Sequence, residues 1–387
     1  MRACSEAVPL YPVYALLFAD TGLSTAQVSS LFAIWSVVAF VAEVPSGALA
    51  DAWSRKRLYA LGELLTAAGY LLWILWPSYP GFALGFVLWG LGGSLASGSL
   101  EALVYDDLAA SGSEADYARV AGRGGTIAIL AMLAATLVAT PAWQWGGYAL
   151  VGALSVAIKT AGALLALRLP ENRSRPDSSP SSSSDPSSSD PSSSDPSSSD
   201  PSSSEDEAAS YWATLKGGVR EAFGSRLVAR ATLVAALVPG FTALDEYLPL
   251  LSQEKGASTA AVPLLYAVTA LAMAAGSALA SRPFPLLVTL PLAAALLAVG
   301  ALVPHLAGMV AVSAAFGLLE YSIIRSETRL QDTITGPART TVLSVAGFGG
   351  EVFAVLLYAT FALPLEMPLL FALCAVPLLL TALIARR

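Results

Sequence analysis

The chain has 387 residues, of which 55% are hydrophobic and only 13% are charged, whereas a soluble domain carries about 25% charged residues. With a mean hydropathy of +0.65, this composition excludes an ordinary soluble domain and predicts a polytopic membrane protein. The net charge of −7 does not indicate an acidic binding surface. Residues 176–207 contain eight acids and no bases, so the rest of the chain carries a charge of about +1.

Few residues suited to metal binding or nucleophilic catalysis are present. The two cysteines, Cys4 and Cys374, lie in apolar runs near opposite ends of the chain, so they indicate neither a disulfide framework nor a metal site. Because His305 is the only histidine, zinc or triad chemistry that depends on histidine is not expected. The sequence also lacks a phosphate-binding G-x-x-x-x-G-K-S/T motif. We therefore expect no enzymatic activity, no cofactor, no metal site and no nucleic-acid partner.

Apolar segments near 20 residues, the length that crosses a bilayer, follow one another along the chain. Backbone groups in lipid must bond within their own segment, so each is predicted to be a helix. In the first half the expected spans are 3–22, 26–50, 57–77, 80–108, 118–140 and 144–168. In the second half they are 226–251, 259–281, 284–303, 306–330, 338–361 and 364–385. The fold class predicted from these spans is an all-α protein with twelve transmembrane helices.

Between the halves, residues 176–204 repeat Asp-Pro-Ser-Ser-Ser units, which cannot bury apolar area and are predicted to be disordered. The expected organisation is therefore an N-terminal bundle at 1–170, a linker at 171–215 and a C-terminal bundle at 216–387. Short matches in the same order indicate that the halves are duplicated. The matching pairs are 21–28 with 255–262, 46–51 with 276–281, and 117–120 with 337–340.

The basic residues indicate the orientation. Under twelve crossings they collect on one side, and the opposite loops contain only Lys255. By the positive-inside rule, both termini and the linker are expected in the cytoplasm. Four lysines against seventeen arginines, with abundant alanine, are typical of a GC-rich bacterial genome. We therefore expect a multi-pass protein of the bacterial plasma (inner) membrane, surrounded by lipid and monomeric.

A basic loop at residues 47–57 separates the second and third spans. Gly47, Asp51, Arg55 and Lys56 fit the pattern G-x-x-x-D-R/K-x-G-R/K-R/K, and here the chain resembles the major facilitator superfamily of transporters. Ala52 and Ser54 depart from the pattern. Glycine lets helices approach closely, and an aspartate can pair with arginine or cap a helix. The resemblance implies two pseudo-symmetric six-helix bundles, a conformational gating role for this loop, and a central cavity lined by the first and fourth helices of each half.

Acidic residues within the predicted helices are the candidate site. Ionisable residues in a membrane are costly and are functional candidates by default. The candidates for binding substrate or protons are Glu6, Glu43, Glu101, Asp245, Glu246, Glu320 and Glu351. Those on the four expected cavity helices include Glu101 and Glu320, which occupy corresponding positions and are expected to face each other. Alternatively, some of these acids are static braces, Glu320 pairs with Arg325, and Glu246 lies near the outer interface. Further intramembrane charges are Asp20, Glu63 and Lys159, of which Lys159 is expected to be ion-paired or to snorkel.

Aromatic residues accompany the acids. Trp35, Ala39 and Glu43 recur at every fourth position and share one helical face. Aromatic faces near carboxylates suit organic cations; an alternative use of such residues is a belt at the lipid interface. The other aromatic residues near the predicted acids are Tyr11, Tyr14, Trp89 and Tyr247.

Together these features favour a transporter of a small molecule coupled to protons. A carboxylate in an apolar cavity retains a proton more readily than one in water, so a proton and a cationic substrate can compete for it. The preferred hypothesis is alternating-access efflux of a cationic or amphipathic organic compound. Proton-coupled uptake of a small metabolite, a lipid flippase and a non-transporting sensor remain alternatives. The fifth span, 118–140, lacks the glycine-proline pattern of many drug antiporters.

Overall fold

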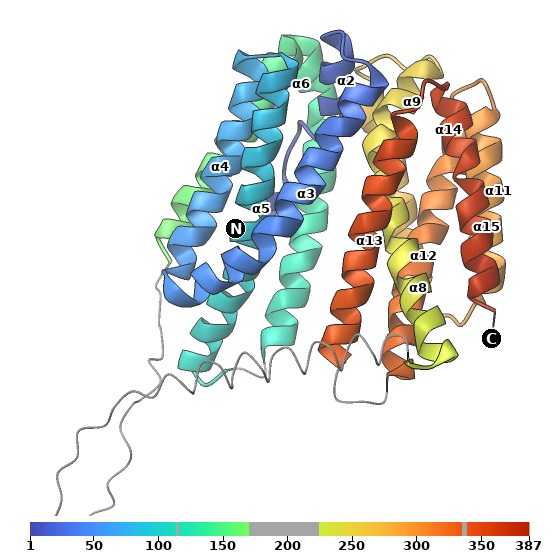
Figure 1. The fold of residues 1–387 in the computed structure, drawn as a ribbon. Coiled ribbons are helices and arrows are strands. Elements are labelled where there is room, and N and C mark those ends of the chain that lie inside the picture. The colour runs from blue at the N-terminus through green and yellow to red at the C-terminus, as the bar shows by residue number, and fades with distance from the viewer. Residues whose placement is uncertain (114–115, 170–223, 335–338, 387) are drawn as a thin grey trace, which may run out of the picture.

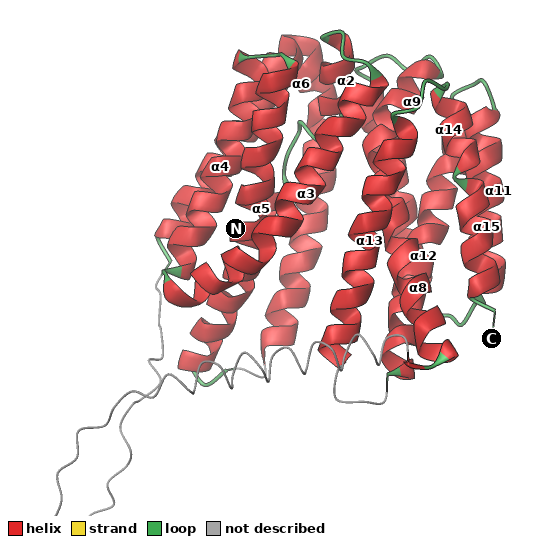
Figure 2. Ribbon diagram, in the orientation of Figure 1, coloured by secondary structure: helices red, strands yellow, loops and turns green. Residues whose placement is uncertain are grey.

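The computed structural model describes residues 1–113, 116–169, 224–334 and 339–386. Within these ranges the chain forms helices joined by short loops, and no β-strand occurs in them (Figure 2). The all-α prediction is therefore confirmed. The predicted linker at 171–215 lies outside the described residues.

The first half forms six helices. They are α1 (Arg2–Glu6), α2 (Tyr14–Asp20), α3 (Thr25–Ala52), α4 (Arg55–Leu75), α5 (Tyr79–Ala110) and α6 (Tyr117–Leu167). The long α6 contains the fifth and sixth predicted spans. It is divided at Gly146 and Gly147, where Gly147 has a φ of 57°, a conformation that favours glycine.

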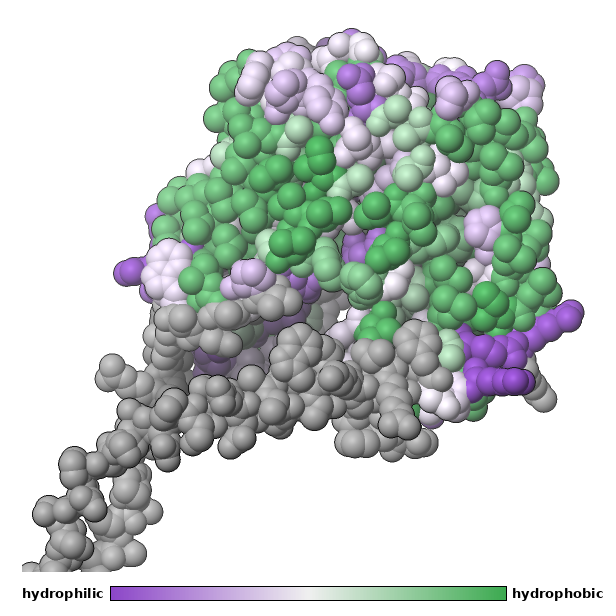
Figure 3. All heavy atoms as spheres, viewed as in Figure 1, coloured by the Kyte–Doolittle hydropathy of each residue, from purple (hydrophilic) through white to green (hydrophobic). Residues whose placement is uncertain are grey.

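The second half repeats this plan after the linker. Its helices are α8 (Arg226–Gly240), η2 (Phe241–Tyr247), α9 (Leu248–Glu254), α10 (Val262–Leu279), α11 (Leu286–Leu302), α12 (Gly308–Thr333), α13 (Arg339–Phe361), α14 (Met367–Leu373) and α15 (Ala375–Ile384). Over the described ranges, nine helical stretches are long and apolar enough to cross a membrane, and α11 is a shorter apolar helix. These elements are consistent with twelve crossings, a number that stays a prediction. Figure 3 shows a broad hydrophobic surface over both halves, with hydrophilic residues gathered towards the two ends.

The helices are arranged as two bundles that lie side by side (Figure 1). The bundles meet where α3 packs against α13, α6 against α10, and α2 against α9. Glycines allow close packing inside each bundle. A Cβ atom at Gly62 of α4 would lie 2.5 Å from the carbonyl oxygen of Gly92 of α5. In the second bundle, a Cβ atom at Gly300 of α11 would lie 2.7 Å from the carbonyl oxygen of Gly308 of α12. The third and fourth spans of both halves therefore need glycine at their contact.

The first span of each half is interrupted near its middle. We predicted continuous helices at 3–22 and 226–251, but residues 7–13 separate α1 from α2, and the 3₁₀ segment η2 separates α8 from α9. Pro9 and Pro12 explain the first break, because proline lacks an N–H group and restricts the residue before it. The freed N–H group of Leu10 donates instead to the Ser155 hydroxyl at 3.1 Å. Pro239 lies just ahead of the second break.

The bundles touch most closely at one end of the molecule. We call the end where α6 finishes and α8 begins the linker end, and the other the far end. Near the far end, Tyr247 donates a hydrogen bond to Ser29 at 2.8 Å, and Thr140 donates to the carbonyl of Ala260 at 2.9 Å. Phe32 packs edge-on against Tyr247 at a centroid distance of 5.3 Å. These contacts close the far end between the bundles.

Candidate substrate cavity

The largest cavity lies against the second bundle and faces α3. Its volume is about 500 Å³. Four acidic residues line it: Asp245 and Glu246 on η2, Glu327 on α12 and Glu351 on α13. No arginine, lysine or histidine is among the described residues that line it. The break in the first span of the second half thus positions two adjacent carboxylates at the wall of an acidic cavity.

Two further cavities continue from the first across the first bundle. A cavity of about 430 Å³ shares Trp35 and Glu351 with the first and is also lined by Glu43. A cavity of about 300 Å³ shares Trp89 with the second and is lined by Glu6 and Glu101 among others. Shared walls make the three a continuous series between the bundles. Towards the linker end the series is lined by Leu330, Gln331 and Leu343.

The two bundles meet at the middle of this series through one polar contact. Ser36 of α3 donates a hydrogen bond of 2.7 Å to Glu351 of α13. Trp35, Ala39 and Glu43 all line the second cavity, which confirms that they share one face. Glu351 is therefore held by one bundle while its helix belongs to the other.

Aromatic rings surround the neighbouring wall. Trp35 lies 5.1 Å from Trp89 between ring centroids, and Trp89 stacks on Tyr11 at 5.5 Å with an interplanar angle of 19°. Tyr11 stands in the break of the first span, next to Glu6 along the same cavity. Ring faces near carboxylates form a surface that attracts cations.

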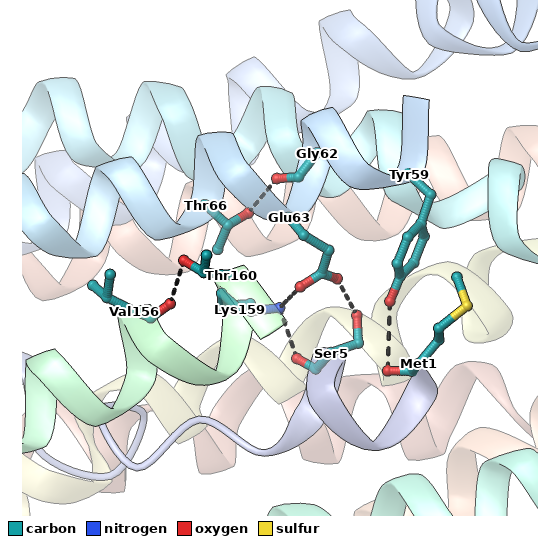
Figure 4. A network of polar contacts seen from close by, with 9 residues as sticks. All are labelled: Met1, Ser5, Tyr59, Gly62, Glu63, Thr66, Val156, Lys159 and Thr160. Carbon is teal, nitrogen blue, oxygen red and sulfur yellow. Dashed lines mark hydrogen bonds and ion pairs between the residues drawn. The ribbon is translucent and has the colours of Figure 1, made fainter. Parts of the chain in front are cut away.

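A buried ion pair closes the side of the third cavity (Figure 4). Lys159 of α6 lies 3.2 Å from Glu63 of α4, and their side chains are only 6% and 1% exposed. The Ser5 hydroxyl donates to the second Glu63 oxygen at 2.7 Å, and Lys159 donates to the Ser5 carbonyl at 2.8 Å. The expectation of an ion-paired Lys159 is confirmed. Because its charges are mutually compensated, this network acts as a brace that fastens α1 to the bundle.

The predicted acids do not all gather at one place. Glu101 pairs with Arg2 at 2.7 Å in a partly exposed position. Glu320 instead lines a separate cavity between α6 and α10, together with Asp245. No described cavity is lined by both Glu101 and Glu320, so the structure does not bring them face to face. Glu246 lines the central cavity, and no ion pair joins Glu320 to Arg325 within the described ranges.

The basic loop is shorter than the sequence suggested. Only Trp53 and Ser54 separate α3 from α4, because α3 continues to Ala52. Ser54 caps α4 by accepting a hydrogen bond from the N–H group of Arg57, which gives a structural role to one departure from the family pattern. The side chain of Asp51 lies outside the described residues. Gly47 is not at a close helix contact: a Cβ atom there would meet nothing within 4 Å, so that expectation was wrong.

The two basic residues of this loop tie neighbouring helices together. Arg55 forms an ion pair with Asp106 of α5 and donates to the carbonyl of Ala102 at 3.2 Å. Lys56 donates to the carbonyl of Leu169 at 3.1 Å, just beyond α6. The start of α4 is thereby linked to α5 and to the end of α6.

Sequence reasoning missed one cavity acid and one partner. Glu327 lies near Arg325 and Arg329, so it was not distinguished from the charged end of its helix. The available signal was its position seven residues after Glu320, which places both on one face of α12. Ser36 gave no signal, because its role depends on a residue 315 positions away.

Two helical bundles with acid-lined cavities between them define a membrane transporter of small molecules. A family model described as "Major Facilitator Superfamily" matches residues 3–356. The chain belongs to this superfamily, is a multi-pass membrane transporter of the alternating-access kind and is not an enzyme. No curated protein matches it.

Solved structures with the same fold cover nearly all of the chain. One is described as a bacterial homolog of the human lysosomal transporter Spinster in an inward-facing, unoccupied conformation, with 16% identity, TM-score 0.65 and coverage of 99% of this chain and 92% of that one. The nucleoside transporter NupG gives 12%, 0.67, 99% and 97%. A D-xylose-proton symporter gives 14%, 0.65, 100% and 94%. At these identities the similarity establishes the fold alone.

Proposed function

We propose that this protein is a proton-coupled transporter that exports a cationic or amphipathic organic compound in exchange for protons. The observation that supports this most directly is the lining of the largest cavity, which has four acidic residues and no basic residue among those described. A cavity lined by one sign of charge concentrates ions of the opposite sign. Anionic solutes would be repelled from the same walls.

The aromatic wall supports an organic rather than an inorganic cation. Trp35 lines both larger cavities and is adjacent to Trp89. A cation over an indole face gains about 0.5–2 kcal/mol, depending on how far it is desolvated. Inorganic cations prefer cages of several oxygen ligands, and no group of three or more potential metal ligands occurs in the described ranges.

Competition at the cavity carboxylates supplies the coupling. Asp245 and Glu246 are adjacent on η2 and partly buried at the cavity wall. A carboxylate that holds a proton no longer attracts a cation, and one that has bound a cation has released its proton. With both bundles moving around these residues, that exclusion is sufficient for antiport.

A second candidate is proton-coupled uptake. One protein with this fold is a D-xylose-proton symporter, and the same carboxylates could accept a proton together with a neutral solute. The absence of basic residues from the described lining of the largest cavity favours a cation over an anion but does not set the direction.

Transport into proteoliposomes separates these functions. With a pH gradient imposed, we expect labelled tetraphenylphosphonium to accumulate against its own gradient, driven by proton movement the other way. Glu246→Gln should abolish accumulation, whereas Glu366→Gln, an exposed acid ahead of α14, should not. Accumulation of neutral sugars or nucleosides in the same direction as protons, with no cation movement, would replace antiport by uptake.

A further inference from the structure

A separate cavity opens at the seam between the bundles. It has a volume of about 260 Å³ and lies between α6 of the first bundle and α10 and α12 of the second. Ile129 and Met132 form its wall on α6. The residues contributed by the second bundle are Asp245, Leu248, Tyr266, Thr269, Ala270, Met273, Ala274, Ser277 and Glu320.

Asp245 connects this lateral cavity to the central one. It lines both the 500 Å³ cavity and the lateral cavity. It stands on η2, where the first span of the second half departs from α-helical geometry. A single carboxylate therefore stands at the junction of two cavities.

The lateral cavity combines acids with an apolar wall. Its charged residues are Asp245 and Glu320, and no base is among the described residues that line it. Glu320 makes no hydrogen bond or ion pair within the described part of the chain, whereas the Thr269 hydroxyl is paired with Ser313 at 2.8 Å. Most of the remaining lining is aliphatic. This chemistry fits a molecule with one positive charge and an apolar extension.

The position of the cavity points to the bilayer. Towards the far end, α6 and α10 are joined by the hydrogen bond between Thr140 and Ala260. Beside the cavity, Ile129 of α6 and Leu271 of α10 are each 56% exposed. Exposed aliphatic side chains on membrane helices face lipid. The seam is thus closed at one end and bordered by lipid-facing side chains beside the cavity.

We propose that the lateral cavity is a subsite for the apolar part of an amphipathic organic cation, whose charged head lies at Asp245 between the two cavities. The inference rests on the proposed function and narrows its substrate class to cations with a substantial alkyl or aryl portion. Glu320 provides a second position for the positive charge as the substrate passes between the bilayer side and the central cavity.

Binding of n-alkyl-trimethylammonium ions of increasing chain length tests this subsite. The full chain would be held in lipid nanodiscs, and each ion would compete with labelled tetraphenylphosphonium. Affinity should rise with each added methylene by up to about fourfold, the value for complete burial, until the cavity is filled. Partitioning of the ions into lipid is the same for all variants, so ratios between variants cancel it.

Two neighbouring alanines provide matched variants. Ala274 lines the cavity and Ala275 does not, yet both are exposed on α10. Ala274→Leu should weaken octyl-trimethylammonium at least about tenfold while leaving tetramethylammonium unchanged, and Ala275→Leu should match the wild type. If Ala274→Leu fails to fold, Met132→Ala on α6 enlarges the same cavity and should move the optimum to a longer chain.

The outcomes separate the two proposals. If wild-type protein binds no organic cation, the proposed function fails and the subsite fails with it. If cations bind, but affinity does not depend on chain length or none of these variants changes that dependence, the subsite is overturned while the proposed function stands. If neutral phospholipid displaces octyl-trimethylammonium in detergent and tetramethylammonium does not, the cavity holds a lipid chain and the assignment to substrate is overturned.

Discussion

Replacing Lys159 by methionine should strongly destabilise the first bundle. The ammonium group is the ion-pair partner of Glu63 at 3.2 Å, and the Glu63 side chain is only 1% exposed. Without it, the carboxylate keeps only the hydrogen bond from Ser5. Breaking a buried pair by removing one partner costs about 3–5 kcal/mol, because the other charge is left uncompensated.

The magnitude can be checked by thermal unfolding in detergent. A loss of this size lowers the midpoint temperature on the order of 10 °C. Replacing both residues by methionine should recover at least about 2 kcal/mol over Lys159→Met, since no buried charge remains. Arg2→Met, which breaks the partly exposed pair with Glu101 (36% and 57% exposed side chains), should cost about 0–1 kcal/mol. If the double variant is no more stable than Lys159→Met, the uncompensated charge is not the cause.

Three further predictions concern the interface, the loop and the linker. Tyr247→Phe removes the hydrogen bond to Ser29, so the population open at the far end should rise about 2- to 13-fold, for a bond of about 0.5–1.5 kcal/mol; distances between spin labels at Ala26 and Ser258, in a variant without native cysteines, would measure it, and an unchanged distribution would contradict it. Ser54→Ala should cost about 1 kcal/mol through loss of the α4 cap, and Ser54→Gly only a few tenths, in thermal unfolding; equal costs would exclude a capping role. Shortening the Ser/Asp/Pro segment at 176–204 to about a third should leave transport intact, because a flexible chain of about 30 residues spans roughly 30 Å; loss of transport in folded protein would show a regulatory role.

Much of the fold could be predicted because bilayer helices are specified locally. An apolar run near 20 residues has few alternatives in lipid, and most predicted spans coincide with helices of the structure. The two interrupted spans were predicted as continuous because hydropathy dominated the reading. Pro9 and Pro12 were a usable signal for the first break, since proline cannot donate to the helix ladder.

The site could be predicted in kind but not in arrangement. Acids in the cavity helices were visible in the sequence, and Asp245, Glu246 and Glu351 do line the largest cavity. Pairing was not visible: Arg2 reaches Glu101 across 99 residues, and this contact depends on how α1 packs. Such long-range choices follow from tertiary packing, which local patterns do not encode.

The most direct test of the central claim is proton release from purified protein when an organic cation binds. In weakly buffered detergent solution, adding tetraphenylphosphonium should release protons from the wild type, and the release should disappear when Asp245→Asn is combined with Glu246→Gln. Glu366→Gln serves as the control and should release protons as the wild type does. Binding of the cation without any release of protons would contradict competition at the cavity carboxylates.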